Sequence, residues 1–378
     1  MRRMAGLWAA LLLVLALTPV QAGAVELPIR AEAALLMEKE TGQVLYAQNE
    51  HEALEPASVT KVMTLLLTME AIEKGSLHYD DMVTVSAYAA SMGGSHVYLS
   101  EGEQITVDDL LKAVCVASGN DAAVALAECV AGVTELFVEQ MNTRAKELGM
   151  TDTHFVNCTG LPAEGHVTSA WDIALMSREL IEKPPDIRRY TTIWMDTLRD
   201  GTFQLANTNK LIRQYEYATG LKTGYTSVAG FCVSASAKKE NIELVAVIMG
   251  GADSKSRFQD AVTLLNSGFA CCSLYTDENR AALPKIPVKG GVEGQVGLQY
   301  ADEFSYVSTD GSNLSQVERV PKLPEEVTAP VEKGDRIGSM VYVLNGREIG
   351  STELLAADTV ERAAYGDYIG QVFRIFLL

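Results

Sequence analysis

Apolar and polar positions along the chain follow patterns that separate strands from helices. Two apolar runs around a Lys-Glu-Thr-Gly turn at residues 33–48, and two more around Lys-Lys-Glu-Asn at residues 231–251, predict β-hairpins. Residues 59–72 are apolar almost all round, which indicates a buried helix. From the end of this helix to about residue 181, and again over residues 256–270, apolar positions recur at helical spacing.

The order of these elements predicts an α/β fold. A hairpin, a long helical block, a second hairpin and a closing helix describe a sandwich in which both ends of the segment build one antiparallel sheet, with helices on its faces and an all-helical insertion. From about residue 276 onward, short β-type runs alternate with Gly, Pro and Asp, which predicts a small all-β domain. We therefore expect a first domain over residues 25–275 and a C-terminal β-sandwich over residues 276–358.

The N-terminal residues predict export. Arg2 and Arg3 precede an apolar stretch at residues 7–17, and small residues follow at 22–24. This is the pattern of a secretory signal peptide, here residues 1–24. An uncleaved membrane anchor is the alternative, but the apolar run is shorter than the roughly 18 residues that a spanning helix needs.

The last segment, residues 359–378, predicts an amphipathic helix. On a helix, Arg362, Gly366 and Gln371 would belong to a small or polar stripe, opposite an aromatic and aliphatic face. Such a helix is too short and too charged to span a bilayer, but it suits the membrane surface. A terminal helix packed on the β-domain is the alternative. Together with the signal peptide, the tail predicts a peripheral protein on the outer face of the cytoplasmic membrane.

Charge and cysteine content exclude several classes of partner. Removing the signal peptide takes two of the 31 basic residues and leaves 29 against 49 acidic ones, a net charge of −20. Such a chain repels phosphate backbones, so no nucleic acid is expected as a partner. The chain contains no C-x-x-C pair and no nucleotide-binding motif, so no metal and no other cofactor is expected. The even number of cysteines permits disulfides, but free thiols are favoured because several lie in apolar segments. The six are Cys115, Cys129, Cys158, Cys232, Cys271 and Cys272.

Ser58 and Lys61 stand three residues apart at the start of the predicted buried helix. On a helix that spacing places both side chains on one face. A serine needs a base to become a nucleophile, and a lysine is a base only when burial or a nearby positive charge lowers its pKa. The alternative is that Ser58 caps the helix. The same spacing at Ser236 and Lys239 falls in a predicted strand, where side chains three apart point to opposite faces.

Two further motifs extend this pair. Ser118-Gly-Asn120 lies between helical segments, where a hydroxyl and an amide can face one cleft, one relaying a proton and one holding a substrate amide. Lys222-Thr-Gly224 opens a predicted strand, where Lys and Thr can bind a carboxylate and Gly lets a substrate approach the strand edge. Lys222 would also supply the positive charge that keeps Lys61 neutral.

In this order and on these types of element, the three motifs resemble those of penicillin-binding proteins and class A β-lactamases. Longer stretches are more specific, and they resemble the low-molecular-mass penicillin-binding proteins, the serine-type D-alanyl-D-alanine carboxypeptidases of bacteria. The resemblance covers most of residues 31–270, and the β-domain and tail fit the same family more loosely. The stretches that carry it are PASVTKVMT, SMGGSHVYLSEGE, LLKAVCVASGNDAAVALAE, MNTRAKELGMTDTHFVNCTGL, HVTSAWDIALMSREL and TNKLIRQYEYATGLKTGYTSVAGFCVSASA.

The resemblance implies a role for each matching residue. Ser58 would be the acylated nucleophile and Lys61 its general base, while Ser118 and Asn120 would shuttle a proton and hold substrate. The backbone N–H groups of Ser58 and Tyr225 would form the oxyanion hole.

The same resemblance implies how the substrate is held. Lys222 and Thr223 would receive the terminal carboxylate beside Gly224. Arg257 matches a family arginine and would help to bind that carboxylate, or would instead form a salt bridge at the start of its helix.

Four positions depart from the family pattern or carry no predicted chemistry. The residue between two asparagines upstream of Lys-Thr-Gly, often basic in the family, is Thr208, so a second carboxylate-binding arginine is not expected. Cys158 stands where the family has a proline. His166 and Asp172 match a family stretch but are expected to be structural.

The implied activity is removal of the terminal D-alanine from peptidoglycan stem pentapeptides through an acyl-enzyme on Ser58, with β-lactam antibiotics as inhibitors of the same serine. The alternatives are a β-lactamase and a non-catalytic peptidoglycan-binding scaffold. A class A β-lactamase needs a glutamate that activates water. The one similar string, residues 139–142, lies in a helical segment that matches the carboxypeptidases.

Overall fold

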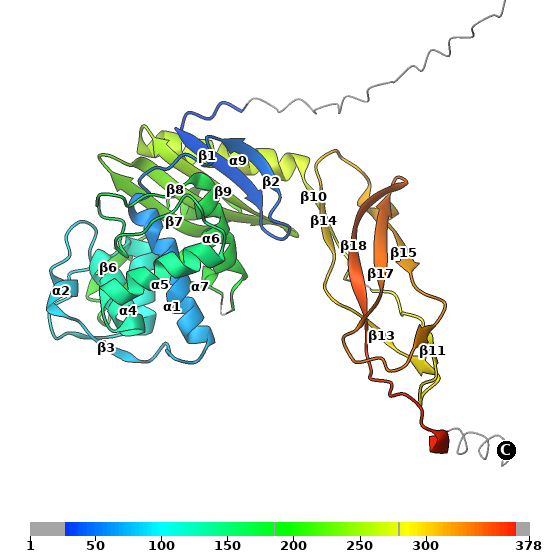
Figure 1. Ribbon diagram of the computed structural model, residues 1–378. Coiled ribbons are helices and arrows are strands. Elements are labelled where there is room, and N and C mark those ends of the chain that lie inside the picture. The colour runs from blue at the N-terminus through cyan, green and yellow to red at the C-terminus, as the bar shows by residue number, and fades with distance from the viewer. Residues whose placement is uncertain (1–26, 185, 279, 368–378) are drawn as a thin grey trace, which may run out of the picture.

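The computed structural model describes residues 27–184, 186–278 and 280–367. The chain forms a larger α/β part and a narrower β part (Figure 1). The predicted signal peptide, residues 1–24, lies outside the described residues, as does the end of the predicted C-terminal helix from residue 368 onward.

A five-stranded antiparallel sheet forms the centre of the α/β part, in the order β2-β1-β9-β8-β7. Both predicted hairpins are confirmed, and the two ends of the segment build one sheet, as expected. Strand β7 forms one edge of this sheet. The strands are β1 (Ala33–Glu38), β2 (Val44–Gln48), β7 (Ala218–Thr226), β8 (Gly230–Lys239) and β9 (Ile242–Gly251).

Alternating side chains bury both faces of the sheet. Leu35 and Met37 face the helical block, whereas Ala34 and Leu36 pack with the long helix α9 (Ser254–Cys271) on the other face. This is the period-2 pattern of a strand that is covered on both sides. The predicted α/β sandwich is therefore confirmed.

The helical block surrounds helix α1 (Lys61–Glu73), which follows a short 3-10 turn, η1 (Ala57–Thr60). All but two of the α1 residues are buried, as its nearly uniform apolar pattern predicts. The other helices are α2 (Ala87–Ala90), α3 (Val107–Lys112), the π-helical turn η2 (Ala113–Ala117), α4 (Asn120–Ala131), α5 (Thr134–Glu147), α6 (Ala170–Glu182), α7 (Arg188–Thr191) and α8 (Leu211–Gln214). Two small hairpins complete the block, β3 (Met82–Thr84) with β4 (Gln104–Thr106) and β5 (Met195–Leu198) with β6 (Phe203–Ala206).

The C-terminal part is built of β-strands, as predicted. Its largest sheet has the order β13-β18-β17-β15, and two smaller sheets pair β10 with β14 and β11 with β12 and β16. Buried Asp277 joins two elements of this part, because it accepts from Tyr342 at 2.8 Å and pairs with Arg319 at 2.9 Å. The strands are β10 (Ser273–Thr276), β11 (Ile286–Lys289), β12 (Gln295–Val296), β13 (Leu298–Tyr300), β14 (Ser305–Ser308), β15 (Glu318–Lys322), β16 (Val327–Thr328), β17 (Arg336–Leu344) and β18 (Arg347–Ala356), with a 3-10 turn, η3 (Leu314–Gln316).

The prediction that the C-terminal helix begins at residue 359 is wrong. Val360 forms a β-bridge with Val331, and Arg362 forms one with Gly291, so residues 359–362 extend the β part. Burial of Val360 in the apolar core of that part favours the extended backbone over a helix. Helical backbone begins only at Tyr365.

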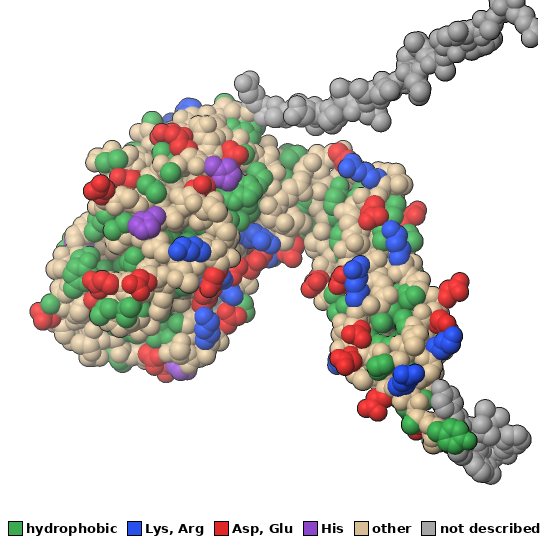
Figure 2. Space-filling model, viewed as in Figure 1, with side chains coloured by type: hydrophobic (Ala, Val, Ile, Leu, Met, Phe, Trp, Pro, Cys, Tyr) green, Lys and Arg blue, Asp and Glu red, His purple; other side chains and the backbone are tan. Residues whose placement is uncertain are grey.

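The six cysteines are free thiols, as favoured from the sequence. Cys129 and Cys271 are exposed, however, while the other four are buried. Acidic and basic side chains are intermixed over the face seen in Figure 2, so that face carries a mixed charge rather than a continuous basic surface.

Candidate active site

The three sequence motifs meet beside the edge strand β7. Strand β7 and turn η1 are in direct contact, and α1 packs against α4. Ser58 lies in η1 and Lys61 is the first residue of α1. Lys61 Nζ lies 2.8 Å from Ser58 Oγ and donates to the carbonyl oxygen of Thr159, also at 2.8 Å. The predicted pairing of the two side chains on one face is therefore present.

Ser58 does not cap a helix. Pro56 precedes η1 and Thr60 precedes α1, and neither position has a side-chain capping hydrogen bond. The hydroxyl of Ser58 instead points toward an amine that is completely buried. This geometry favours the nucleophile interpretation of the Ser58 and Lys61 pair over the capping alternative.

The environment of Lys61 favours its neutral form. Burial holds the pKa of Lys61 well below its ordinary value of 10.5, and the positive charge of Lys222 lowers it further. Both causes were expected from the sequence. A neutral amine in contact with a hydroxyl can accept its proton.

Ser118 and Asn120 lie where helix η2 gives way to α4. Ser118 has a left-handed backbone conformation, with φ 63°, which turns the chain between the two helices. Asn120 is buried, and its Nδ2 donates to the carbonyl oxygen of Gly93 at 2.7 Å. Its Oδ1 has no hydrogen-bond partner among the described residues. A buried amide oxygen without a partner is unusual, and this one remains able to accept an N–H group.

Asp121, which the sequence reasoning did not single out, attaches a loop to this motif. Its carboxylate accepts the backbone N–H groups of Val97 and Leu99 at 2.9 to 3.1 Å. The signal was available, because Asp121 directly follows Asn120 in the quoted stretch. The fold that brings Asp121 against this loop could not be predicted from the sequence.

Gly224 lets strand β7 lie directly against the nucleophile. A Cβ atom at this position would be 2.8 Å from the carbonyl oxygen of Pro56 and 3.0 Å from the backbone nitrogen of Ser58. A larger residue would therefore separate β7 from η1. Tyr225 follows, with its ring stacked on Phe231 at 4.2 Å between centroids.

Two buried cations lie on the β7 side of the site. Lys222 donates to the carbonyl oxygen of Thr223 at 2.8 Å, and burial lowers the pKa of Lys222 to about 7. Arg257 donates to the carbonyl oxygens of Gly224 and Cys232 at 3.0 and 3.1 Å. Burial lowers the pKa of Arg257 to about 10, and its Nε has no partner among the described residues.

The predicted alternative for Arg257, a salt bridge at the start of its helix, is wrong for the described part of the chain, where this arginine contacts carbonyl oxygens and no carboxylate. Thr223 Oγ1 donates to the hydroxyl of Thr208 at 2.8 Å, so the residue that replaces the expected basic side chain is a direct neighbour of the motif. Two buried cations that face no carboxylate among the described residues favour binding of an anion.

His166 and Asp172 lie behind the site, as expected for structural residues. His166 Nε2 is 2.8 Å from the hydroxyl of Thr60, and burial lowers the pKa of His166 to about 4. Asp172 accepts from the backbone of Asp152 and the hydroxyl of Thr153 at 2.8 and 2.7 Å. His166 Nδ1 also accepts the backbone N–H of Val156 at 3.0 Å, so both side chains hold the segment that supplies the Thr159 carbonyl.

Gly160 lies in this segment, and its substitution tests how tightly the segment packs on the turn that carries Ser58. Gly160 has φ +82°, and a Cβ atom there would lie 1.8 Å from the carbonyl oxygen of Ala57. We expect Gly160→Ala to lower the free energy of unfolding by about 3 kcal/mol, from backbone strain and overpacking together. Urea unfolding of the purified variant measures this loss.

Gly165→Ala is the matched control for Gly160→Ala. Gly165 lies in the same segment with φ +80°, but a Cβ atom there would be 3.9 Å from the nearest side-chain atom. Its substitution should cost only about 1 kcal/mol, from backbone strain alone. Equal losses for the two variants would contradict the tight contact between Gly160 and Ala57.

Comparison with known proteins agrees with this geometry. Residues 20–253 match the family described as D-alanyl-D-alanine carboxypeptidase, and residues 276–362 match the C-terminal domain of penicillin-binding protein 5. D-alanyl-D-alanine carboxypeptidase DacF of Bacillus subtilis is 40% identical over 344 residues, which cover 90% of this chain and 88% of that protein.

Solved structures are similar to a large part of this chain. Penicillin-binding protein 5 from Haemophilus influenzae superposes with a TM-score of 0.78 at 31% identity, covering 88% of this chain and 98% of that one. Penicillin-binding protein D2 from Listeria monocytogenes, solved in an ampicillin-bound form, has a TM-score of 0.59 at 30% identity and covers 64% of this chain and 98% of its own. The chain belongs to the D-alanyl-D-alanine carboxypeptidase family.

Proposed function

We propose that this protein is a serine D-alanyl-D-alanine carboxypeptidase that removes the terminal D-alanine from peptidoglycan stem pentapeptides. The observation that carries the proposal is the 2.8 Å contact between Ser58 Oγ and the buried amine of Lys61. Membership of the family supports it, as do the two buried cations Lys222 and Arg257, which pair with no carboxylate in the part of the chain that the structure describes.

In the acylation step, Ser58 Oγ attacks the carbonyl carbon between the two D-alanines while Lys61 Nζ accepts the hydroxyl proton. The backbone N–H groups of Ser58 and Tyr225 stabilise the oxyanion, since Gly224 lets β7 approach η1. The C–N bond then breaks, and the proton passes from Lys61, with Ser118 as relay, to the departing amine of D-alanine. The peptide remains as an ester on Ser58.

In the deacylation step, a water molecule attacks this ester. Lys61, neutral again, accepts a proton from the water, and Ser58 recovers its own proton as the C–O bond of the ester breaks. The products are D-alanine and a stem peptide that is shorter by one residue. Asn120 Oδ1, which has no partner among the described residues, accepts an amide N–H of the peptide and keeps it in register.

Recognition of a free carboxylate makes the enzyme a carboxypeptidase. Lys222, Thr223 and Arg257 together present two positive charges and a hydroxyl beside β7. A peptide bond inside a longer chain carries no negative charge at the corresponding position, so it leaves both cations without a counter-ion. We expect this cost to exclude internal peptide bonds.

The decisive measurement is the release of D-alanine from a peptide ending in D-Ala-D-Ala by the purified protein, together with the lifetime of its complex with fluorescent penicillin. The proposal predicts repeated turnover of the peptide and a penicillin adduct that persists through many such turnovers. Rapid hydrolysis of penicillin would identify a β-lactamase instead. Absence of D-alanine release would favour the alternative function, a non-catalytic peptidoglycan-binding scaffold.

The pH dependence of the reaction should report the charge of Lys222. Its pKa in the free enzyme is lowered to about 7, so the cation that binds the substrate carboxylate is lost as the pH rises through this value. We expect kcat/KM to fall by up to about tenfold for each pH unit above it, whereas kcat falls only at higher pH because the bound carboxylate stabilises the charged amine.

Lys222→Arg tests this assignment of the alkaline limb. Arginine stays charged throughout the range, so the fall in kcat/KM should move to higher pH even if the altered geometry lowers the maximum rate. The measurement is kcat/KM for D-alanine release between pH 5 and 10. An alkaline limb at the same pH in both proteins would assign it to another group.

We also propose that the protein acts outside the cytoplasm, at the outer surface of the cytoplasmic membrane. The pattern of a signal peptide at residues 1–24 and the amphipathic pattern of the C-terminal residues support this location. Within the part of the chain that the structure describes, no helix has the length and hydrophobicity needed to cross a bilayer. The C-terminal segment is too short and too charged to span a bilayer, so we propose that attachment through it is peripheral.

A further inference from the structure

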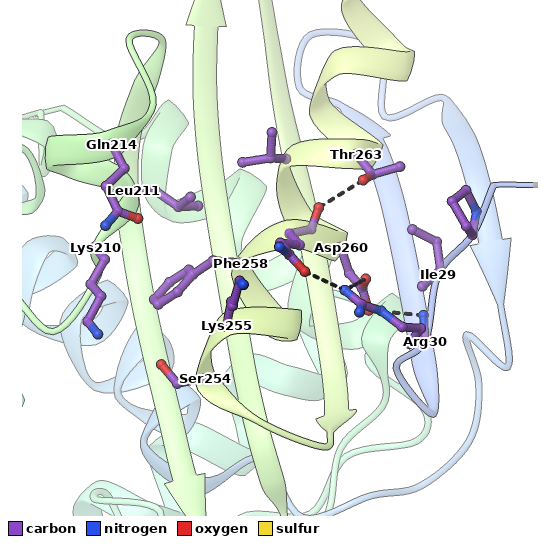
Figure 3. A pocket seen from close by; sticks show the side chains of 13 residues that line it. Ile29, Arg30, Lys210, Leu211, Gln214, Ser254, Lys255, Phe258, Asp260 and Thr263 are labelled. Atoms are coloured by element: carbon purple, nitrogen blue, oxygen red, sulfur yellow. Dashed lines mark hydrogen bonds and ion pairs between the residues drawn. The ribbon is translucent and has the colours of Figure 1, made fainter.

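A groove of about 1060 Å³ lies on the α9 side of the central sheet, outside the site described above (Figure 3). The segment that precedes β1, helix α8 and the first turns of α9 line it. Ile29, Leu211, Phe258 and Val262 contribute apolar surface. A concave surface of this kind, with apolar walls and a few polar groups, is typical of a binding site.

The cations of this groove differ in whether they have partners. Arg30 pairs with Asp260 at 3.4 Å and donates to Gln259 at 2.8 Å, and buried Asp260 also accepts the backbone N–H of Arg30 at 3.0 Å. Lys210 and Lys255 are both exposed, and their ammonium groups make no ion pair or hydrogen bond within the described residues. In Figure 3 the ring of Phe258 is drawn between these two lysine side chains.

The groove therefore carries two uncompensated positive charges in a chain whose net charge is −18. Among the described residues that line the groove, the one carboxylate is that of Asp260, and it is already engaged. Charge complementarity thus favours an anionic ligand, and the partly exposed side chains of Ile29 and Val262 favour one that also has apolar groups.

The groove begins close to the carboxylate-binding end of the proposed active site. Ser254, which lines the groove, is 3.5 Å from Arg257, and Arg257 contacts the carbonyl oxygen of Gly224 in the Lys-Thr-Gly motif. On the α8 side, Lys210 lies two residues after Thr208, whose hydroxyl bonds to Thr223. One substrate molecule with several anionic ends could therefore reach both places.

We propose that this groove is an exosite that holds a second stem peptide of the same peptidoglycan polymer by its terminal carboxylate while the first stem occupies the active site. The inference rests on the proposed function. Every stem peptide, cleaved or uncleaved, ends in a carboxylate next to the methyl group of an alanine. Lys210 and Lys255 match the carboxylate, and the partly exposed side chains of Ile29 and Val262 match the methyl groups and the peptide backbone.

The test compares two substrates of the full protein. One is an isolated N-acetylated peptide ending in D-Ala-D-Ala, and the other is a soluble glycan oligomer that bears several pentapeptide stems. The exosite predicts a higher kcat/KM per stem on the oligomer, because the second contact raises the effective concentration of the first. Reversing both charges, in Lys210→Glu/Lys255→Glu, should reduce this preference about fivefold or more and leave kcat/KM on the isolated peptide within about twofold.

Three controls assign the effect to charge in this groove. Lys210→Arg/Lys255→Arg keeps both charges and should keep the preference. Lys146→Glu reverses an exposed lysine in α5, which forms no part of the groove, and should have no effect. Raising the salt concentration from about 0.05 to 0.5 M should weaken the preference of the native protein, since exposed charges are screened.

The outcomes separate the exosite from the active-site proposal. If D-alanine is released from the isolated peptide but the oligomer shows no preference, or a preference that the double charge reversal leaves intact, the exosite is overturned and the proposed function stands. If neither substrate releases D-alanine, the proposed function fails first. A polyphosphate chain is the second ligand to be tested. If the double charge reversal weakens binding of polyphosphate but leaves the preference for the oligomer unchanged, the groove serves a phosphate polymer and the inference is wrong.

Discussion

Replacing Ser58 with alanine is expected to lower D-alanine release by roughly 10⁴-fold or more and to abolish covalent labelling by fluorescent penicillin. The reason is that alanine leaves Lys61 in place but removes the atom that forms the ester. Steady-state release of D-alanine measures the first effect, and the mass of the intact protein after incubation with penicillin measures the second.

Ser236→Ala is the matched control for this experiment. Ser236 has the same spacing to Lys239 as Ser58 has to Lys61, but Ser236 is fully buried in β8, and its hydroxyl lies 2.8 Å from that of Thr219. Its loss should leave labelling and turnover intact. A Ser58→Ala protein that still gains the mass of penicillin, or a Ser236→Ala protein that does not, would show that the nucleophile has been misassigned.

Lys61→Met is expected to have opposite effects on activity and stability. Methionine fills the volume of the lysine chain but accepts no proton, so acylation by penicillin and by peptide should slow by about 10²- to 10⁴-fold. Folding at neutral pH must remove the proton or bury the charge of Lys61, whose pKa is held well below 10.5. Removing the amine should therefore raise the free energy of unfolding at pH 7.

The direction of this stability change with pH is a further check. A lysine whose pKa is lowered in the folded state destabilises the fold while the unfolded chain still binds the proton, that is, below its ordinary value of 10.5. The advantage of Lys61→Met should thus shrink as the pH approaches that value. Urea unfolding at pH 7 and pH 10 measures it.

Lys74→Met at the other end of α1 provides the comparison, because this lysine side chain is 72% exposed and lies 4.0 Å from Glu70. It should change neither the acylation rate nor, beyond about 0.5 kcal/mol, the stability. Acylation of Lys61→Met within tenfold of the native rate would mean that another group takes the proton of Ser58.

Much of the fold could be predicted because the elements that carry it have strong local patterns. The hairpins β1-β2 and β8-β9 show two apolar runs around a polar turn, and α1 is apolar on all sides. The C-terminal helix was misplaced at its start for the opposite reason. Val360 pairs with Val331, a partner distant in the chain, and no local periodicity reports such a bridge.

The types of residue in the site could also be predicted, but their partners could not. The Ser58 and Lys61 pair follows from helical spacing, which is a local property. The left-handed turn at Ser118 and the contact of Thr223 with Thr208 depend on where separate segments cross. The sequence likewise left two interpretations of Arg257 open, carboxylate binding and a salt bridge. Its contacts with the carbonyl oxygens of Gly224 and Cys232 argue against the salt bridge.

The sequence alone was sufficient for the order of elements, the three motifs and the family that they resemble, because each depends on residues close together in the chain. Only the tertiary structure decided the environment of the Lys61 amine. Its pKa depends on complete burial and on the charge of Lys222, which is far away in sequence but close in space. The same spacing at Ser236 and Lys239 gives no such pair, because a strand places the two side chains apart.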